Sequence, residues 1–523
     1  ALKATTDHNE VQRGHELLMG YVEYCNNDVH LAREAFKYFT KMITPDEMQY
    51  GDMILKCYIE PSLYLDLPII EEEIQRIHER DEQRARDVAN KYFGGNQAEL
   101  RSVCRSVPKF TEFLQGLGGV LEHEIDEDAD YAFIIPSKYS EKKGRVEPCY
   151  SKTFPPVIEM CDRMDEIGDI FRTKLALSSS IELSRAERFR AIAKLGCGFG
   201  MPYVVSGAHT HRLGGADKLN PQNLSSGRKA GQSNALKRSI VAPPGYKVVV
   251  FDSSQIELRT GSYIAGDYAT LNLFLAGKDP YSQQASLIYG GDPDEIKKLA
   301  KSGVEPYASI QRPAGKASLL SNIYGTGAVG FMNYAKLMGV DMTLEEAQHI
   351  VKVYRETHPE VVAIWNACDV ALRNMIAGAS GYFGGPDGRL FYYDGARMNH
   401  GVRMPGIRLP DGNWLNYHCL SMREREYPDG STKMNYAYRG LKEGRIQWIF
   451  TYAARIFENC NQALAFAVMK YQALLINQRY KIVLNTHDEW GIVVKDEEVE
   501  QAKEYMQWCM RQVPEWAKGL PVD

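Results

Sequence analysis

Residues 246–259 read YKVVVFDSSQIELR, a run of apolar side chains that stops at an acid. A Pro-Pro-Gly turn precedes the run, so the pattern predicts a buried strand that ends at Asp252. A second acid, Glu257, follows five residues later in a segment with helical spacing. The stretch therefore predicts a strand with a carboxylate at its end.

A second pair of apolar runs lies near the end of the sequence. Residues 481–484 (KIVL) and 491–494 (GIVV) flank a short polar turn, a pattern that predicts a hairpin. The turn contains His487, Asp488 and Glu489. The chain thus has two apolar strands that lead into carboxylates, with a long region of mainly helical pattern between them. Helical patterns also predict long helices at residues 68–92, 343–357 and 455–475.

Carboxylates at strand ends suit phosphoryl transfer. Two divalent ions ~3.5–4 Å apart can neutralise the attacking and the leaving oxygen, and bridging carboxylates hold them. Magnesium suits this role because it takes many of its ligands from water and substrate phosphates. The alternative is that Asp252 and Asp488 are ordinary turn residues. The presence of two such acids, each after an apolar strand, favours the catalytic interpretation.

A basic segment lies between the acidic ones. Residues 312–325 read RPAGKASLLSNIYG, in which Arg312, Lys316, Leu320 and Tyr324 are spaced by four. On an α-helix these four would form one slowly winding stripe about 18 Å long. Two cations, an apolar side chain and an aromatic ring match the order of phosphates, sugar and base in a nucleoside triphosphate. The alternative is a half-buried helix with two surface cations.

The length and composition of the chain set broad limits on its domain number, partners and location. A chain of 523 residues predicts two to four domains, and its net charge of −5 neither favours nor excludes nucleic acid. The ten cysteines show no C-x-x-C spacing, which argues for free thiols rather than a zinc site. No run of about 18 apolar residues occurs, so we expect a cytoplasmic protein without a membrane partner. The acidic run at 122–130 predicts a solvated loop.

Several motifs resemble those of family A DNA polymerases, the DNA polymerase I type, and especially their bacteriophage branch. Residues 252–259, 312–325 and 487–489 are similar to the three polymerase motifs. Residues 209–224 (HTHRLGGADKLNPQNL) and 452–463 (YAARIFENCNQA) are similar to two segments that contact primer and template. The five segments occur in the order found in that family.

The resemblance implies a right-hand polymerase fold of the α+β class. In this fold residues 41–190 would form a helical thumb, and residues 263–440 would form helical fingers. The palm, an antiparallel sheet, would consist of residues 191–262 and 441–523. Residues 1–40 would be the remnant of a 3′–5′ exonuclease domain.

The resemblance also implies a role for each matched residue. The catalytic residues would be Asp252, Asp488, Lys316 and Glu489. The metal ligands would be Asp252, Asp488 and the Ser253 backbone carbonyl. The nucleotide would contact Arg312, Lys316, Leu320, Tyr324, Glu257, Gln255 and Tyr281. DNA would contact Arg212, Gln222, Asn223, Gly325, Asn459, Gln462 and His487.

The implied cofactor is a pair of Mg²⁺ ions, for which Mn²⁺ could substitute. The implied partners are primer–template DNA and deoxynucleoside triphosphates, and a processivity or replisome protein is a further candidate. Lys316 would also be the general acid for pyrophosphate departure, and Glu257 with Tyr324 would exclude a 2′-hydroxyl. Leu320 replaces the Phe or Tyr common in the family, as in phage members, which predicts poor use of dideoxynucleotides.

The N-terminal segment carries part of a further motif. Tyr24 and Asp28 resemble the Y-x3-D motif of the proofreading exonuclease that precedes this polymerase in the family. Because that chemistry uses four acidic residues, we expect the full-length parent, but not this chain, to proofread.

The resemblance predicts a template-directed DNA polymerase of viral DNA replication. A single-subunit RNA polymerase would share the two aspartates and the basic helix, but Glu257 argues against it because a carboxylate near the 2′ position disfavours ribonucleotides. An inactive DNA-binding protein of the same fold is the other alternative. Such proteins usually lose the metal carboxylates, whereas Asp252 and Asp488 are both present.

Overall fold

The computed structural model describes most of the chain as two compact units. The described residues are 8–121, 131–140, 145–151, 154–178, 181–217, 219–225, 227, 233–395, 398–399, 402–427, 431–442 and 444–523. The acidic run at 122–130 lies outside them. Unit 1 comprises Ala1–Ile59, Tyr203–Gly215 and Gly245–Asp523, and unit 2 comprises Glu60–Pro202 and Ala216–Pro244.

Unit 2 is mainly helical. The predicted helix at 68–92 is confirmed as α3 (Leu67–Tyr92), whose first turn is capped by the Asp66 carboxylate accepting from the Ile69 N–H at 3.1 Å. The other helices are α4 (Gln97–Arg105), α5 (Val107–Gly116), α6 (Pro155–Asp162), α7 (Glu166–Ser178), α8 (Ile181–Ala193) and α9 (Ala235–Arg238). Phe110 and Phe171 are fully buried in the core of this unit.

Short strand pairs complete unit 2. Three two-stranded sheets are formed by β1 (Tyr64–Leu65) with β8 (Ile240–Val241), β2 (Gly119–Leu121) with β3 (Phe133–Ile135), and β4 (Ser137–Ser140) with β5 (Arg145–Pro148). The 3-10 turn η3 (Pro221–Asn223) also belongs to this unit.

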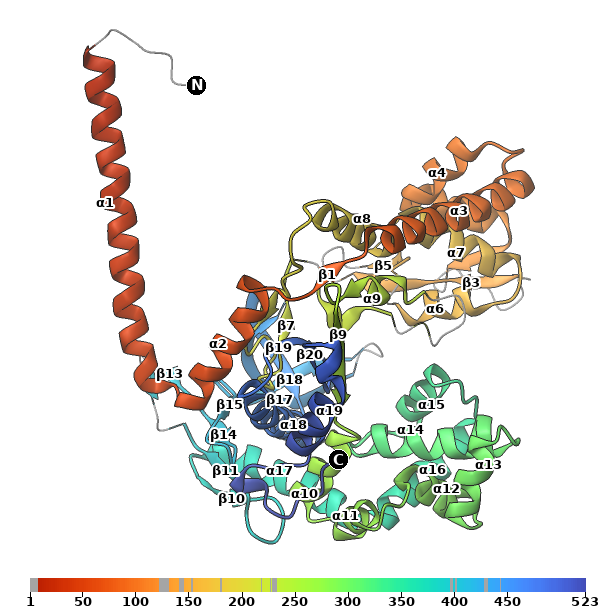
Figure 1. Cartoon of the computed structure of the whole chain (residues 1–523). Helices are drawn as coiled ribbons and strands as arrows, with labels where there is room; N and C mark the ends of the chain where they lie inside the picture. The colour runs from red at the N-terminus through yellow and green to blue at the C-terminus, as the bar shows by residue number, and fades with distance from the viewer. Residues whose placement is uncertain are drawn as a thin grey trace. The chain divides into compact units, whose positions relative to one another are not determined.

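Unit 1 contains the sheet predicted from the two apolar segments. Its strands β9 (Tyr246–Asp252), β19 (Ile482–Thr486) and β20 (Glu489–Lys495) are arranged in the antiparallel order β19-β20-β9 (Figure 1). Trp490 in the central strand is fully buried, and its indole N–H donates to the Met469 carbonyl of α18 (Ala453–Asn477) at 3.1 Å. The sheet is thereby fixed against the long helix predicted at 455–475.

Helices follow β9 as far as Ala377. They are α10 (Ile256–Ala265), α11 (Tyr268–Leu275), α12 (Pro280–Tyr289), α13 (Pro293–Lys301), the π-helix η4 (Tyr307–Gln311), α14 (Arg312–Asn322), α15 (Ala328–Leu337), α16 (Leu344–Thr357) and α17 (Pro359–Ala377). Helices α12 and α14 pack closely, because Gly315 has no side chain: a Cβ there would lie 2.8 Å from the Ala285 backbone N.

Strands begin again at Gly381, so the prediction of helical structure throughout 263–440 is wrong for its last part. One antiparallel sheet has the order β10 (Gly381–Phe383), β11 (Leu390–Tyr393), β14 (Gly406–Arg408), β15 (Trp414–Asn416). A second consists of β16 (Ser421–Glu426), β17 (Thr432–Lys442) and β18 (Arg445–Thr451). The small pairs are β12 (Met398–Asn399) with β13 (Val402–Arg403) and β6 (Tyr203–Val204) with β7 (Gly214–Gly215).

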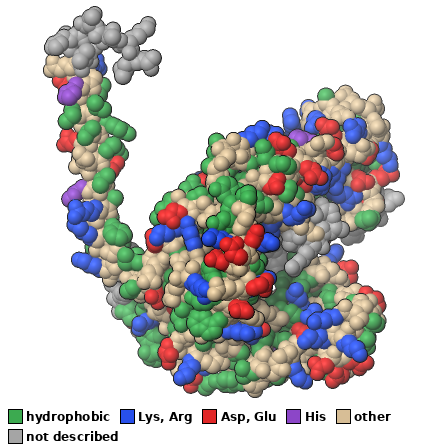
Figure 2. All heavy atoms as spheres, viewed as in Figure 1, with side chains coloured by type: hydrophobic (Ala, Val, Ile, Leu, Met, Phe, Trp, Pro, Cys, Tyr) green, Lys and Arg blue, Asp and Glu red, His purple; other side chains and the backbone are tan. Residues whose placement is uncertain are grey.

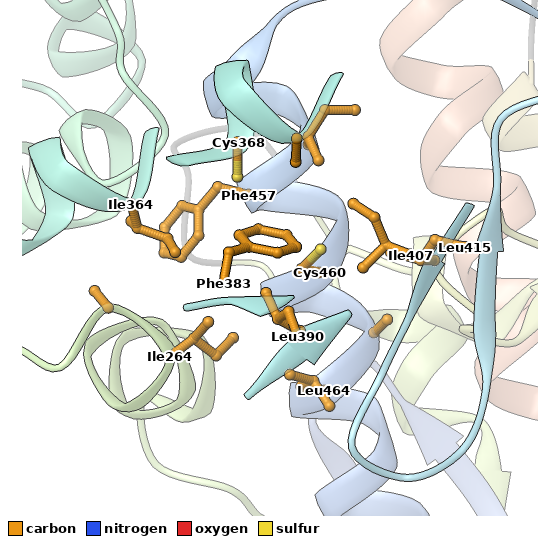
Figure 3. Packing of buried hydrophobic residues seen from close by; sticks show 14 of the residues in the cluster. Ile264, Ile364, Cys368, Phe383, Leu390, Ile407, Leu415, Phe457, Cys460 and Leu464 are labelled. Atoms are coloured by element: carbon orange, nitrogen blue, oxygen red, sulfur yellow. The ribbon is translucent and has the colours of Figure 1, made fainter. Parts of the chain in front are cut away.

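The main core of unit 1 joins these helices and strands. In Figure 3, Phe457 and Cys460 of α18 lie beside Phe383 of β10, Leu390 of β11 and Ile264 of α10. Segments nearly 200 residues apart thus share one apolar cluster, which fixes α10 and α18 against each other. The α+β class predicted from sequence is confirmed.

The ends of unit 1 are helical. They contain α1 (His8–Phe39), η1 (Thr40–Met42), α2 (Pro45–Ile59), η5 (Asp496–Glu498), α19 (Val499–Met510) and η6 (Glu515–Ala517). Helix α1 exposes large apolar side chains such as Leu17 and Phe36, and hydrophobic atoms are visible along it in Figure 2. In the described part of the chain no helix is long and apolar enough to cross a membrane. All ten cysteines are free thiols.

Candidate active site

The two acidic segments meet at one end of the β9–β20 pair. Asp252, the last residue of β9, lies directly opposite Glu489, the first residue of β20. The Ser253 N–H donates a hydrogen bond to the Asp488 carbonyl, with 2.8 Å between N and O. His487 starts the turn in the left-handed region, with a φ of 57°. Backbone pairing therefore places Asp252 and Asp488 side by side on a rigid support.

The Asp488 carboxyl lies in a negative environment. Burial raises its pKa, and the nearby carboxylates of Glu257 and Asp252 raise it further, against the opposing charges of Arg212 and His487. The Arg212 Nη2 atom lies 3.8 Å from Asp488 Oδ1. Acids that destabilise each other's charge in this way are relieved by a divalent cation, so the residues present fit a metal site.

Few protein groups are available to such a cation. Within the described ranges, no group of three or more His, Cys, Asp or Glu side chains is arranged as a metal site. A cation between Asp252 and Asp488 would take its other ligands from backbone carbonyl, water or substrate oxygens, which is the coordination that Mg²⁺ favours. Ser253 is itself buried, follows Asp252 in the chain and bonds through its N–H to the Asp488 carbonyl.

Glu257, in the first turn of α10, is held by several groups. Arg212 forms an ion pair with its Oε1 atom, and the Tyr324 hydroxyl donates to its Oε2 atom at 2.5 Å. Asn461 of α18 donates to the Glu257 carbonyl at 2.8 Å and to the Tyr324 oxygen at 3.0 Å. Thr260 donates to Asn461 Oδ1 at 2.6 Å. The Glu257 carboxylate is consequently held by Arg212 and Tyr324, and its backbone is bonded to α18 through Asn461.

Tyr324 stays protonated in this network. Burial raises the pKa of its phenol well above the ordinary value, and the Glu257 charge raises it further. A neutral hydroxyl can donate to the carboxylate, whereas a phenolate would repel it. The contact therefore holds at any pH near neutrality.

Helix α14 carries the stripe predicted from its sequence. Arg312, Lys316 and Leu320 are half-buried, as is Tyr324 just beyond the helix, whereas the other residues from Ala314 to Ile323 are buried. One line of the helix surface is thus accessible to a ligand, and it presents the cations first and the aromatic ring last.

The helix is slightly shorter than predicted. It ends at Asn322, so Tyr324 lies after the helix rather than on it. The Tyr324 N–H bonds to the Ser321 carbonyl at 3.2 Å, a tighter turn that follows because the Gly325 backbone has a φ of 74°. A Cβ at Gly325 would lie 2.7 Å from the Ala454 Cβ, so this position needs glycine for space as well as for conformation.

The first cation of the stripe already has a partner. Arg312 Nε lies 2.8 Å from the Oδ2 atom of Asp279, whose side chain is 8% exposed. The guanidinium carbon of Arg312 and the Lys316 Nζ atom lie 5.6 and 5.7 Å from the ring centroid of Tyr281. Tyr281 thereby supports both cations from α12.

Comparison with known proteins agrees with this geometry. Residues 202–376 match the sequence model of the family described as DNA polymerase family A. The thermostable DNA polymerase I of Thermus thermophilus is 32% identical over 155 residues, which cover 29% of this chain and 16% of that protein. The DNA polymerase of Bacillus phage SP02 is 25% identical over 302 residues, which cover 55% of this chain and 42% of that protein.

The similarity to DNA polymerase family A extends over residues 202–376.

The fold comparison covers almost the whole chain. The POL domain of Pol1 from M. smegmatis, in complex with DNA primer-template and dNTP, superposes with a TM-score of 0.57 at 17% identity. The match covers 95% of this chain and 71% of that chain, which confirms the right-hand polymerase fold. The sequence matches span only 16% and 42% of the two relatives' lengths.

Some residues expected to contact DNA lie outside unit 1 or form hydrogen bonds with other side chains of this chain. Gln222 and Asn223 lie in η3 of unit 2. On α18, the Asn459 amide donates to the Tyr417 hydroxyl at 3.2 Å, and the Gln462 amide donates to Glu458 at 3.3 Å.

Gln255 lies at the start of α10 with a φ of 55°. Its Oε1 atom is buried and accepts no hydrogen bond from the described residues. This orphaned acceptor lies in the family A motif between Asp252 and Glu257, where a ligand donor could satisfy it.

The exonuclease-like residues are not part of this site. Tyr24 and Asp28 lie one turn apart on α1, and the Tyr24 side chain is 62% exposed.

Two residues of the candidate site are not predicted from the sequence. Asn461 was overlooked although it is a polar residue on the apolar face of α18, where only a buried hydrogen-bond role would retain it. Asp279 lies in a segment that resembles phage members, but its role was not predicted, because its partner Arg312 lies 33 residues away.

Proposed function

We propose that this chain is the polymerase part of a DNA-directed DNA polymerase that adds deoxynucleoside triphosphates to a primer 3′ end. The observation that carries the proposal is the pairing of Asp252 with Glu489, next to Asp488, within one network that reaches α14 through Glu257 and Tyr324. Acids on a sheet end and cations on a neighbouring helix can bind the two ends of one triphosphate.

Asp252, Asp488 and the Ser253 carbonyl would hold two Mg²⁺ ions, with Mn²⁺ as a substitute. When bound, the ions would neutralise the charge on the attacking and leaving oxygens. Arg312 and Lys316 would bind the triphosphate, and the Lys316 ammonium would give a proton to the departing pyrophosphate oxygen. Glu489, at the first position of β20, would support the primer end.

A DNA polymerase fits better than an RNA polymerase. The Glu257 carboxylate is held by Arg212 and Tyr324, and Asn461 bonds to the Glu257 backbone carbonyl, so the side chain has little freedom to move away from a sugar. A fixed carboxylate opposite C2′ would disfavour a hydroxyl there by steric clash and by the cost of displacing its present partners.

Primer extension tests the proposal. Asp252→Asn and Asp488→Asn should each lower the extension rate by roughly 1,000-fold, because each removes several kcal/mol of charge stabilisation. Asp496→Asn, at an exposed acid after β20, is the matched control and should extend like the wild type. A wild-type protein that extends no primer with Mg²⁺ and all four deoxynucleotides would refute the proposal, as would full activity of Asp488→Asn.

The finer assignments belong to the same proposal. A role in viral DNA replication is supported by the match to the phage SP02 DNA polymerase over 55% of this chain. Binding of primer–template DNA and a deoxynucleotide is supported by the likeness to a POL domain in complex with both. The division into thumb, palm and fingers, and the contacts of Arg212, Asn459, Gln462 and His487 with DNA, extend this assignment.

A further inference from the structure

The β16–β17–β18 sheet has one strongly basic face. Strand pairing aligns Arg423 with Asn435 and Arg439 with Trp448, so these side chains lie on one side of the sheet. Side chains two residues along each strand share that side. We call this surface the basic-aromatic face; it consists of Arg423, Arg425, Lys433, Arg439, Trp448 and Phe450.

Three of the four cations on this face lie near aromatic rings. The guanidinium carbon of Arg423 lies 3.5 Å from the Trp448 ring centroid, and that of Arg425 lies 5.3 Å from the Phe450 centroid. Lys433 Nζ lies 5.7 Å from the Tyr427 ring. These contacts hold long basic side chains flat over the sheet and reduce the entropy that they would lose on binding a ligand.

The charge of the face is uncompensated. None of its four cations forms an ion pair within the part of the chain that the structure describes, and Arg423, Arg425, Lys433 and Arg439 are all exposed. The acids of β16, Glu424 and Glu426, lie on the opposite side of the sheet by strand alternation. The face therefore presents four positive charges together with stacking surfaces.

Two hollows border this sheet. A hollow of about 580 Å³ is lined by Arg423, Trp448 and Phe450, together with Met422, Glu424 and Met434. A second hollow of about 520 Å³ shares Met422 and Met434 with the first.

The second hollow extends to the residues that follow the basic helix. It is lined by Trp365, Tyr452 and Gly325, and Gly325 comes directly after Tyr324 in the chain. The two hollows therefore adjoin at Met422 and Met434, which by strand alternation lie on the side of the sheet opposite to the basic-aromatic face.

We propose that the basic-aromatic face binds single-stranded DNA, with phosphates on the four cations and bases stacked on Trp448 and Phe450. Alternating positive charge and aromatic rings is the chemistry by which proteins hold single strands without reading their sequence. The bound strand is the unpaired template on its way to the active site. That identity rests on the proposed polymerase function, whereas the binding itself does not.

Direct binding tests the face. A labelled oligo-dT of about 16 nucleotides, in the range of single-strand binding sites, is titrated with the full chain and followed by fluorescence anisotropy. The double variant Arg423→Glu/Arg425→Glu should raise Kd by about tenfold or more. It should also reduce the slope of log K against log salt concentration by about 0.7 for each phosphate that the protein no longer neutralises.

The matched control is Arg445→Glu, an exposed arginine at the start of β18 on the opposite side of the sheet. It should bind oligo-dT like the wild type. Unchanged binding by the double variant overturns the proposal, and so does an equal loss in the control. A loss that is as large for duplex DNA of the same length also overturns it, because a stacking surface needs unpaired bases.

Stacking is tested separately. Trp448→Ala should weaken oligo-dT binding by about tenfold, the usual effect of removing one stacking ring. Because Trp448 is half-buried, the thermal unfolding midpoint is measured in parallel. If that midpoint falls sharply, the exposed Arg423→Ala variant replaces it, and unchanged binding in that variant counts against the proposal.

Primer extension separates this inference from the proposed function. On a template with a long single-stranded overhang, Arg423→Glu/Arg425→Glu should raise the KM for DNA, whereas on a one-nucleotide overhang it should act like the wild type. Equal KM values on the long overhang refute the template path. If the wild type extends no primer, the proposed function fails, and the oligo-dT titration still decides whether the face binds single strands.

Discussion

Glu257 contacts three side chains. Its carboxylate binds Arg212 and Tyr324, and its backbone carbonyl accepts a hydrogen bond from Asn461. The Tyr324 hydroxyl is the only one of these groups that comes from the end of α14, so it links the sheet-side acids to the basic helix. A hydrogen bond to a charged partner is worth about 1.5–3 kcal/mol, enough to decide where the carboxylate lies.

The Tyr324→Phe variant should lose part of its sugar discrimination. The ring stays in place, but Glu257 Oε2 loses its donor, so the carboxylate can move away from a 2′-hydroxyl. We expect the preference for deoxynucleotides over ribonucleotides to fall by roughly tenfold. Single-nucleotide insertion of each substrate measures it. Tyr505→Phe, whose hydroxyl donates to the Leu475 carbonyl instead, should keep the preference of the wild type.

At this scale the sequence predicts acids and cations better than their partners. Asp252 and Asp488 stand out because each follows an apolar strand, and the Arg312 stripe stands out by its spacing of four. The bonds of Asn461 to Glu257 span 204 residues, and nothing in the local pattern indicates that these two segments meet. Such partners become visible only when the chain has folded.

At the scale of elements, α12 and α14 depend on a glycine at their contact. Gly315→Ala would place a methyl group against the Tyr281 carbonyl and the Ala285 N–H of α12, two backbone groups that cannot rotate away. The helices would have to separate, at a cost of about 2–3 kcal/mol. Lower thermal stability and weaker deoxynucleotide binding should follow together.

The control for this prediction is Gly327→Ala. Gly327 precedes α15 with a negative φ, and an added Cβ there would meet no atom within 4 Å. It should unfold at the wild-type temperature or slightly above, because alanine restricts the unfolded chain. If Gly315→Ala were as stable as Gly327→Ala, the inference that α12 and α14 are in close contact at Gly315 would be wrong.

A buried polar chain joins further helices in the same region. The Asp267 carboxylate accepts from the Thr270 hydroxyl at 2.6 Å and lies 3.0 Å from His358 Nδ1. His358 Nε2 lies 3.0 Å from Gln284 Oε1 on α12. Burial alone would raise the pKa of Asp267, but the hydrogen bonds and charge of His358 and the bonds of Thr270 outweigh it, so the pKa is lowered.

A carboxyl whose pKa is lowered by folding stabilises the protein above its unfolded pKa, which is about 3.9 for aspartate. That contribution is lost as the pH falls through the folded value. Asp267→Asn should therefore lower the unfolding midpoint at pH 7, and the difference from the wild type should shrink below about pH 4. Thermal unfolding between pH 3 and 7 measures it, with exposed Asp341→Asn as the control. A difference that grows in acid would contradict this.

Strong periodicity makes elements predictable, and its absence hides them. The strands at 246–252 and around 482–494 and the helices at 68–92, 343–357 and 455–475 were predicted close to their observed bounds. The strands after Ala377 were missed, because β10, β14 and β15 have three residues each and β16 alternates charges instead of apolar side chains. Short or charged strands depend on their partners more than on their own sequence.

At the scale of the whole molecule, the right-hand fold followed from the order of five motifs rather than from composition. Its division into two compact units was not predicted from any linker signal. The chain passes between the units four times, so each unit is built from separated stretches of sequence. Residues 203–215 thereby bring Arg212 into the unit that holds Asp252 and Asp488.

The whole chain should not trim mismatched primers. Tyr24 and Asp28 lie exposed on α1, and within the described ranges they have no cluster of further acids to hold two metal ions. A primer with a 3′ mismatch, incubated with Mg²⁺ and no nucleotides, should keep its length for hours, with Asp28→Ala indistinguishable from the wild type. Metal-dependent shortening that is lost in Asp28→Ala would overturn this expectation.

The pairing of Asp252 with Glu489 makes the site sensitive to the length of β20 as well as to the identity of its side chains. These acids share a side of the sheet with Val250 and Gly491, whereas Phe251 and the buried Trp490 point the other way. Deleting Glu489 would move Trp490 into the position opposite Asp252 and turn every later residue of the strand to the opposite side of the sheet. Natural variants of this strand should therefore differ by substitution and almost never by insertion or loss of a residue.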